Sequence, residues 1–327
     1  MKKYNCLIIN NEIWTLELRI KYDLEIFDYI ILAESNKTFS GISKPFYYEK
    51  YKHLFKEYED KIIYCKIYNL PEPIQGNFIG NERKPVGFNR WPAEHYMRHQ
   101  FKKFIVNNTN DEDFIYFQDL DEIQNNEIFK KHISEGNGED IVYNAMNNYK
   151  FTLTSLECSK QTPWFKSFVT TTKIIKQIDV HDYRKIHPFR STHRDIEDYA
   201  KLNESKPTYW TYHIADGDNL KHNDLFMDSV YSRYVAPVQN IVFEDIVRGI
   251  HISAMTYHID SKMKLDCFSH NEIKTGFENL YSASDLEKKT DDIIEKYYDT
   301  KMTITPDNWL IKRYPFVLDT KFGGMYQ

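Results

Sequence analysis

The sequence is poor in cysteine, and its cysteines form none of the common cysteine motifs. Cys6, Cys65, Cys158 and Cys267 are scattered along the chain and give no C-x-x-C pair. This pattern is typical of reduced, mostly buried thiols. It argues against a small disulfide-linked domain and against a structural zinc site.

Long hydrophobic runs and an excess of positive charge are also missing. No apolar run approaches the roughly 20 residues that a membrane-spanning helix needs. The opening "MKKYNCLIINNEIW" meets Asn and Glu too early for a signal peptide, so we expect a cytoplasmic protein without a transmembrane segment. The net charge of -5 argues against a general nucleic-acid or anionic-membrane binder, although it leaves room for a local basic patch.

Glycine and proline are few, whereas aromatic residues are many. The chain has 11 Gly and 11 Pro against 25 Tyr and 21 Phe. Aromatic enrichment can indicate surfaces on which sugars or bases stack. A compositional drift toward Lys, Asn, Ile and Tyr explains it equally well. With 327 residues and 41% hydrophobic content, the chain can bury one large or two modest cores.

Strands and helices alternate in the first part of the chain. Apolar runs of buried-strand length occupy residues 5–10, 28–35 and 61–68, and helical spacing occupies residues 15–27 and 51–60. The apolar runs are continuous rather than alternating, which is typical of strands buried on both faces. The sequence therefore predicts an α/β fold with a mostly parallel central sheet.

The middle of the chain continues this pattern less regularly. Residues 70–88 are rich in Pro, Gly and Asn and are expected to be loop. A helix is expected from Trp91, followed by a strand at 114–118. Residues 140–153 and 167–175 are predicted to form further strands, antiparallel to their neighbours.

The end of the chain is predicted to be mostly helical, and no internal repeat or convincing linker divides the sequence. We therefore expect one domain over residues 1–270. A helical C-terminal extension, residues 271–327, is expected to pack on it.

Carboxylates directly follow the predicted strand at 114–118. In "FIYFQDLDEI", Asp119 and Asp121 stand two positions apart at the strand's carboxyl end, the edge where open α/β sheets bind ligands. Alternate residues of an extended chain project to the same side, so both can approach one hard cation such as Mg²⁺ or Mn²⁺. An ordinary acidic turn is the other interpretation, and the segment alone leaves both open.

Several short motifs occur together in one order and resemble glycosyltransferase family 17, the β-1,4-mannosyl-glycoprotein 4-β-N-acetylglucosaminyltransferase family. The motifs run from residue 5 to about residue 272. They are Asn10 with Glu12; Glu34, Ser35, Thr38, Gly41 and Pro45; Trp91, Glu94, Tyr96 and Arg98; "DEDFIYFQDLDEI"; "GIHIS"; and "DCFSHNE". The main departure is Ile250, where the family usually has Trp.

The resemblance implies a GT-A-type, Rossmann-like fold and an inverting, metal-dependent glycosyltransferase. It implies a UDP-sugar donor, UDP-GlcNAc above others, and a glycan or glycoconjugate hydroxyl as acceptor. In this fold Asp119 and Asp121 hold Mn²⁺ or Mg²⁺ on the diphosphate, with Asp121 the direct ligand. His251 in "GIHIS" is a third ligand or a diphosphate contact, with a buried core histidine as the alternative.

For three other residues the sequence leaves two roles open, a contact with the nucleotide and a structural contact. Glu12 and Glu34 could accept hydrogen bonds from the nucleotide, as Asp119 could, or could cap a helix and fix a loop. Arg98 could pair with phosphate, or it could hold Glu94 and the Asp-x-Asp loop in place. Glu122 is expected to brace the acidic loop through backbone amides rather than bind metal.

The catalytic base is the residue that the sequence indicates least. The resemblance implies inversion, which needs a base on the acceptor hydroxyl. Glu244 and Asp245 in "FEDI" are candidates because they stand shortly before His251, where an acidic residue can serve as base in other enzymes of the implied fold. Two other classes of protein compete with a transferase. One is a non-catalytic nucleotide-sugar or carbohydrate-binding protein on the same fold, and the other is a metal-dependent phosphohydrolase.

Overall fold

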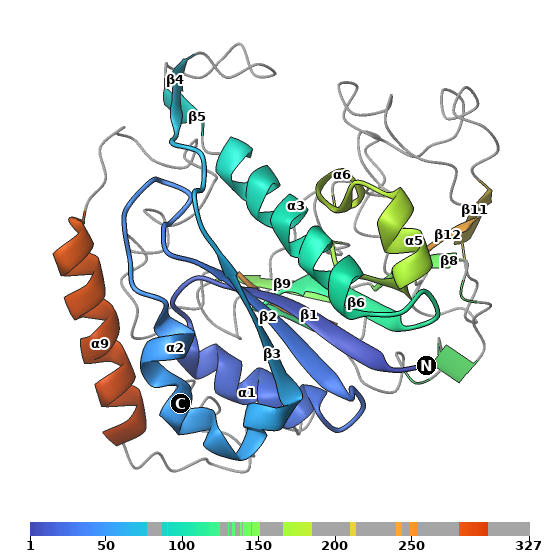
Figure 1. Cartoon of the computed structure of the whole chain (residues 1–327), viewed down its shortest axis with the longest axis horizontal. Coiled ribbons are helices and arrows are strands. Elements are labelled where there is room, and N and C mark those ends of the chain that lie inside the picture. The colour runs from blue at the N-terminus through green and yellow to red at the C-terminus, as the bar shows by residue number, and fades with distance from the viewer. Residues whose placement is uncertain are drawn as a thin grey trace. The chain divides into compact units, whose positions relative to one another are not determined.

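The structure is a computed structural model whose elements are labelled in Figure 1. It describes residues 1–76, 87–89, 91–124, 130, 133–134, 138, 140–144, 146–150, 166–184, 210–213, 240–243, 249–253 and 281–299. Every structural statement below concerns these residues.

The first part of the chain alternates strands and helices as predicted. Its elements are β1 (Lys3–Ile9), α1 (Ile13–Asp23), β2 (Tyr29–Ser35), α2 (Tyr47–Tyr51), the 3-10 helix η1 (Lys52–Lys61) and β3 (Ile62–Ile67). β2 is buried at six of its seven positions, as a strand covered on both faces should be. Helix α1 stops at Asp23, earlier than predicted, and a turn follows in which the Asp23 carbonyl accepts the amides of Ile26 and Phe27.

The middle of the chain contributes the longest helix and the strand that ends in carboxylates. Its elements are β4 (Ile74–Gly76), β5 (Gly87–Asn89), α3 (Trp91–Asn108), β6 (Phe114–Asp119), β7 (Glu122–Ile123), β8 (Asp140–Tyr143) and β9 (Met146–Lys150). The remaining described elements are β10 (Phe168–Thr171), α5 (Thr172–Gln177), α6 (Val180–Tyr183), β11 (Trp210–His213), β12 (Asn240–Phe243), β13 (Gly249–Ser253) and α9 (Ala283–Asp299).

The main sheet has the strand order β11-β12-β8-β10-β6-β1-β2-β3. It is mixed and mostly parallel, which confirms the predicted α/β class. Strand β10 is antiparallel to both β6 and β8, as expected for the strands of this region, whereas β12 is parallel to β8. A second sheet has the order β7-β13-β9. The GT-A assignment and the helical extension as a whole stay predictions.

Two expectations about local structure were wrong. Residues 70–88 are not all loop, because β4 and β5 pair antiparallel with Gln75 opposite Phe88. Residues 167–175 are not one strand, because the chain turns into α5 after Thr171. The amides of Thr172 and Lys173 donate to the carbonyls of Asp113 and Asp111, both at 3.0 Å, and this contact with the turn before β6 ends the strand.

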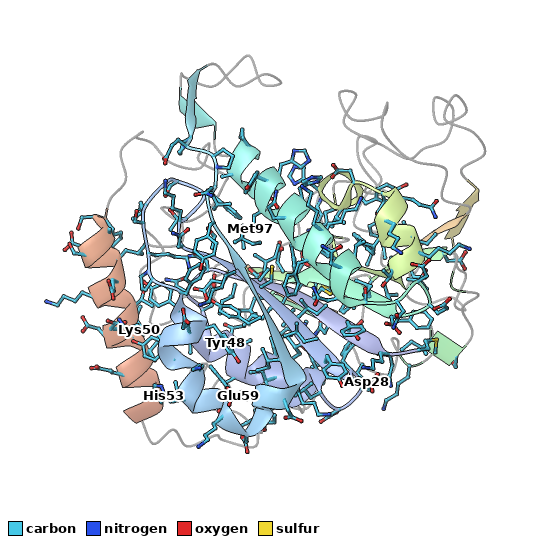
Figure 2. The ribbon with its side chains drawn as sticks, in the orientation of Figure 1. Asp28, Tyr48, Lys50, His53, Glu59 and Met97 are labelled. Carbon is cyan, nitrogen blue, oxygen red and sulfur yellow. The ribbon has the colours of Figure 1, made fainter. Side chains whose placement is uncertain are left out.

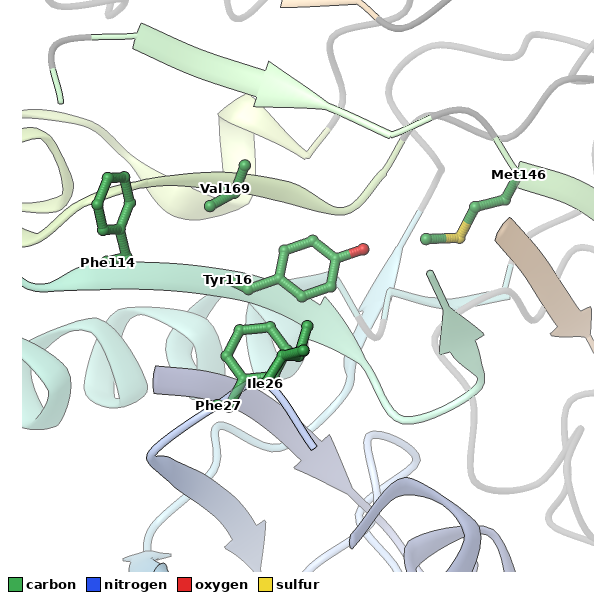
Figure 3. Packing of buried hydrophobic residues seen from close by; sticks show 6 residues of the cluster. All are labelled: Ile26, Phe27, Phe114, Tyr116, Met146 and Val169. Atoms are coloured by element: carbon green, nitrogen blue, oxygen red, sulfur yellow. The ribbon is translucent and has the colours of Figure 1, made fainter. Parts of the chain in front are cut away.

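The chain forms two compact units, each assembled from several segments. Unit 1 comprises Met1–Leu7, Asp23–Ile31 and Lys102–Ser253; unit 2 comprises Ile8–Tyr22, Leu32–Phe101 and Ala254–Gln327. Part of the core of unit 1 appears in Figure 3, where the rings of Phe27 and Tyr116 stack with centroids 6.0 Å apart. Burying each such side chain stabilises the fold by roughly 1.5–3 kcal/mol. Tyr116 satisfies its hydroxyl by donating to Ser167 Oγ at 3.1 Å.

Helix α9 is the helix that the structure describes within residues 271–327. It packs within unit 2, where Thr290 accepts a hydrogen bond from the Asn11 side chain at 3.2 Å and Asp291 binds Lys50 of α2. Figure 2 labels Lys50 on α2, and Figure 1 shows α9 in red. The boundary between domain and extension stays a prediction. Among the described helices, none combines the length and apolar composition needed to cross a bilayer.

Candidate functional site: the acidic segment after strand β6

The acidic segment, residues 119–122, is a tight turn between β6 and β7. Asp119 is the last residue of β6, Leu120 and Asp121 form the turn, and Glu122 starts β7. Glu122 is fully buried, whereas the Asp119 side chain is 30% exposed and Asp121 is partly exposed. The Glu122 carboxylate accepts the Asp119 amide at 3.0 Å, so it braces the turn through the backbone, as predicted.

Arg184 joins the buried Glu122 to the partly exposed Asp119. One guanidinium nitrogen donates to Glu122 Oε2 at 2.9 Å, and the other donates to Glu122 Oε1 at 2.8 Å and to Asp119 Oδ2 at 2.6 Å. The Arg184 side chain is 3% exposed. A forked guanidinium suits this geometry because its parallel N–H groups match the two oxygens of one carboxylate.

Reasoning from the sequence missed Arg184. It directly follows α6, in a polar stretch without periodicity. The only available signal was general: a buried carboxylate needs a cation, and the chain has 43 Lys and Arg from which to choose.

Strand β13 brings His251 beside the acidic segment at the level of the backbone. β13 pairs antiparallel with β7, and in this register His251 stands opposite Glu122 and Ile250 opposite Ile123. On its other side β13 pairs with β9 in parallel. His251, distant in sequence, therefore lies beside the acidic segment in the backbone register. Its role as a ligand stays a prediction.

Glu34 in unit 2 is enclosed by its own loop. It is fully buried and accepts hydrogen bonds from Lys44 Nζ at 2.8 Å, from the amides of Tyr47 at 2.6 Å and Tyr48 at 3.0 Å, and from the Tyr64 hydroxyl at 2.7 Å. Burial first, and the charge of Glu34 second, raise the pKa of Tyr64 far above its ordinary value. These contacts are of the loop-fixing kind, and a nucleotide contact by Glu34 stays a prediction.

Glu12 and Arg98 likewise make local contacts. The Glu12 carboxylate accepts the amides of Asn10 at 3.1 Å and Asn11 at 3.0 Å, just before α1. Arg98 forms a buried ion pair with Glu94 one turn earlier on α3. Glu12 thus shows the loop-fixing contact that was its alternative to nucleotide binding, and Arg98 shows the contact with Glu94, while its contact with the Asp-x-Asp loop stays a prediction. The nucleotide contacts themselves stay predictions.

The candidate bases and the metal site are not decided by these contacts. Glu244 and Asp245 lie outside the described residues. Among the side chains that the structure describes, no group of three or more His, Cys, Asp or Glu could hold a metal ion. The side chain of His251 is not among them, so the ligand set of Asp119, Asp121 and His251 stays a prediction.

The structure is that of an α/β protein with a braced acidic turn at the end of a buried strand. The comparison with protein families names its family. The model of glycosyltransferase family 17 matches residues 1–182. The chain belongs to glycosyltransferase family 17, and the family indicates a glycosyltransferase. The match includes the acidic segment and ends just before Arg184, and it does not reach His251.

Comparisons with individual proteins add little. No curated protein matches the chain. Among solved structures, mannose-6-phosphate isomerase from Helicobacter pylori is similar at 10% identity, covering 74% of this chain and 97% of that chain, with a TM-score of 0.31. A likeness this low carries no argument about the activity of this chain.

Proposed function

We propose that the protein is an inverting, metal-dependent glycosyltransferase that moves GlcNAc from UDP-GlcNAc to a hydroxyl of a glycan or glycoconjugate. One observation carries the proposal. The braced acidic turn directly follows the buried strand β6, inside the region that matches the family. This is the sheet edge at which α/β proteins bind nucleotide ligands.

The residues of the turn have the right chemistry for a divalent cation. Carboxylate oxygens are the ligands that Mg²⁺ and Mn²⁺ prefer. Asp119 Oδ2 already accepts a hydrogen bond from Arg184, and Asp121 is partly exposed at the tip of the turn. We therefore assign the direct contact to Asp121, with Asp119 beside it and His251 as the candidate imidazole. A bound cation would neutralise negative charge that develops on the UDP leaving group.

The chain's own groups bind and orient the two substrates, and one of them accepts the proton of the acceptor hydroxyl. The acceptor oxygen attacks the anomeric carbon from the face opposite UDP, the bond from that carbon to UDP breaks, and the configuration inverts. The hydroxyl proton passes to a carboxylate acting as general base, for which Glu244 and Asp245 remain the proposed residues. Glu122 and Arg184 touch none of the reacting atoms in this scheme and hold the turn.

The donor is tested by ligand-induced stabilisation. Because a ligand that binds only the folded state stabilises it by mass action, saturating UDP with Mn²⁺ is expected to add roughly 2–4 kcal/mol of stability and to raise the melting temperature by several degrees. UDP without Mn²⁺ should give a smaller rise. Protection by purine nucleotides but not by UDP would contradict the uridine assignment.

An assay of UDP release and of the sugar product distinguishes a catalyst from a protein that only binds the donor. Wild-type protein with Mn²⁺ should hydrolyse UDP-GlcNAc slowly and so release UDP. A suitable glycan acceptor should make UDP release faster and should yield a glycoside of inverted configuration. Stabilisation by UDP and Mn²⁺ with no UDP release would favour the non-catalytic binding protein instead.

A further inference from the structure

We propose that Arg184 is a positioning residue that fixes the acidic segment for cation binding and leaves the direct contact to Asp121. The inference rests on the proposed function and extends it to a residue outside the family match. The guanidinium spans both carboxylates that flank Asp121 in the sequence, bonding Asp119 Oδ2 at 2.6 Å and Glu122 Oε1 at 2.8 Å through one nitrogen.

Arg184 is itself held from several sides, as a positioning residue must be. Its amide donates to the Val180 carbonyl at 3.2 Å, which continues α6. Its guanidinium also donates to the Lys166 carbonyl at 3.0 Å, just before β10. The buried Tyr143 of β8 donates its hydroxyl to the Tyr183 carbonyl at 2.7 Å, beside Arg184 in the chain. The main chain at residues 183–184 is thus fixed by α6 and β8, and the Lys166 carbonyl holds the guanidinium itself.

The burial of Arg184 decides how it can act. At 3% side-chain exposure it is not placed to meet a diphosphate from solvent. It meets the site through Asp119, which is 30% exposed, and through the turn that Glu122 braces. One positive charge also reduces the repulsion among three carboxylates within four residues. Arg184 therefore acts on the cation through the carboxylates and not by contact.

The test uses Arg184→Lys, which keeps the charge but cannot form the fork to Glu122 and Asp119 together. The readout is Mn²⁺ binding without turnover, measured from the electron paramagnetic resonance signal of free Mn²⁺ in the presence of UDP. We expect the folded variant to bind Mn²⁺ about tenfold more weakly, the change that a lost positioning contact of this size gives. Sugar transfer should fall in parallel.

Arg19→Lys is the matched control. Arg19 is fully buried in α1 and has no assigned role at the site. Its replacement should lower the melting temperature as any buried Arg→Lys change does, and should leave Mn²⁺ affinity unchanged. If Arg184 acts in folding alone, Arg184→Lys should also lower the melting temperature and leave Mn²⁺ affinity unchanged. That result would overturn the proposal.

A second pair of variants keeps the proposal testable if Arg184→Lys does not fold. Arg184→Met with Glu122→Gln removes the charges of the buried pair together, which is far less destabilising than removing one partner. The double variant should bind Mn²⁺ more weakly than Glu122→Gln alone, and equal binding would overturn the proposal. Failure of the wild-type protein to bind Mn²⁺ with UDP would remove the proposed function and this inference with it.

Discussion

The three carboxylates of the acidic segment have different surroundings although they are neighbours in sequence. Glu122 is fully buried and accepts hydrogen bonds from the Arg184 guanidinium, and Asp119 Oδ2 accepts one from the same group. Asp121 is partly exposed at the tip of the turn. This partly exposed side chain is the one proposed to contact the cation.

Replacement of Asp121 should separate activity from stability. We expect Asp121→Ala to lower transfer by about 10²-fold or more, as when a main stabiliser of transition-state charge is removed. The melting temperature should change little because the residue is partly exposed. Steady-state kinetics and thermal unfolding measure the two effects.

Asp111→Ala is the control for this variant. Asp111 lies in the turn at the opposite end of β6, where it makes an exposed ion pair with Lys176. Such pairs contribute about 0–1 kcal/mol, so both activity and stability should stay near wild type. Equal activity of the Asp121 and Asp111 variants would contradict the assignment of Asp121.

Glu34 should behave as a structural residue in a stability measurement. Its carboxylate and Lys44 Nζ form an ion pair whose side chains are 0% and 1% exposed. Removing one partner leaves an unpaired buried charge, so Glu34→Ala should lower the free energy of unfolding by about 3–5 kcal/mol in urea titrations. Glu49→Ala breaks the exposed pair with Lys66 and should cost no more than about 1 kcal/mol. Similar costs for both variants would contradict the importance of the buried pair.

At this scale the sequence allowed the carboxylates to be predicted but not their partner. Asp119 and Asp121 could be found because they directly follow a recognisable buried strand. Arg184 could not, because a contact between residues so distant in sequence depends on how β10 and α6 fold back onto β6. Glu34 was given two possible roles, and only the folded loop shows that its oxygens are engaged by Lys44, two amides and Tyr64.

Helix α9 contacts the rest of unit 2 through a buried hydrogen bond and through exposed ion pairs. The buried Thr290 hydroxyl accepts a hydrogen bond from Asn11 Nδ2 at 3.2 Å and donates to the Leu286 carbonyl at 2.8 Å. Lys50, with 34% of its side chain exposed, pairs with Glu287 and Asp291 at the surface. The Asn11 contact joins α9 to the loop that follows β1.

The buried contact should matter more than the exposed pairs. Thr290→Val keeps the shape but removes the acceptor for Asn11, which we expect to cost about 1–3 kcal/mol. Lys50→Ala should cost no more than about 1 kcal/mol, and this smaller effect should shrink further in high salt. Hydrogen exchange of α9 amides measures both, and a larger effect from Lys50→Ala would contradict this ranking.

Elements were predictable where periodicity was strong and not where tertiary contacts decide. The strands β1, β2, β3 and β6 and the helix α3 follow the apolar pattern of the sequence. The end of β10 does not, because "TTTKII" continues a strand-like run while the turn at residues 111–113 captures its next two amides. The pairing of β4 with β5 was hidden by a Pro- and Gly-rich composition.

The whole molecule should lose stability at alkaline pH because several tyrosines are buried. Burial is the leading cause that raises their pKa from 10.0, to about 12 for Tyr4 and Tyr48. The same direction holds for Tyr51, Tyr64, Tyr143 and Tyr183. Above pH 10 the unfolded chain therefore binds fewer protons than the folded chain, and the free energy of unfolding falls as the pH rises toward 12.

Urea titrations across this alkaline window test the prediction. Tyr64→Phe should reduce the slope of stability against pH, because it removes one raised pKa, although it also costs the bond to Glu34. The ultraviolet absorbance of tyrosinate should rise together with unfolding. Ionisation of Tyr4, Tyr48 and the other tyrosines named above near pH 10 in the folded protein would contradict the burial argument.

The order of strands was the least predictable feature of the whole molecule. The α/β class followed from alternating helices and buried strands. The second sheet, β7-β13-β9, could not be foreseen, because β7 has only two residues and its partner β13 lies far along the chain. That sheet is what places His251 opposite Glu122, a neighbourhood that the sequence motifs implied only through a family resemblance.

The most direct test of the proposed function is the release of UDP from UDP-GlcNAc by the purified protein, with Mn²⁺ and with EDTA. Release is expected with Mn²⁺, and EDTA should abolish it. Asp121→Ala should lower it by about 10²-fold while Asp111→Ala retains it. Full activity of the wild-type protein in EDTA would contradict a metal-dependent site at the acidic segment.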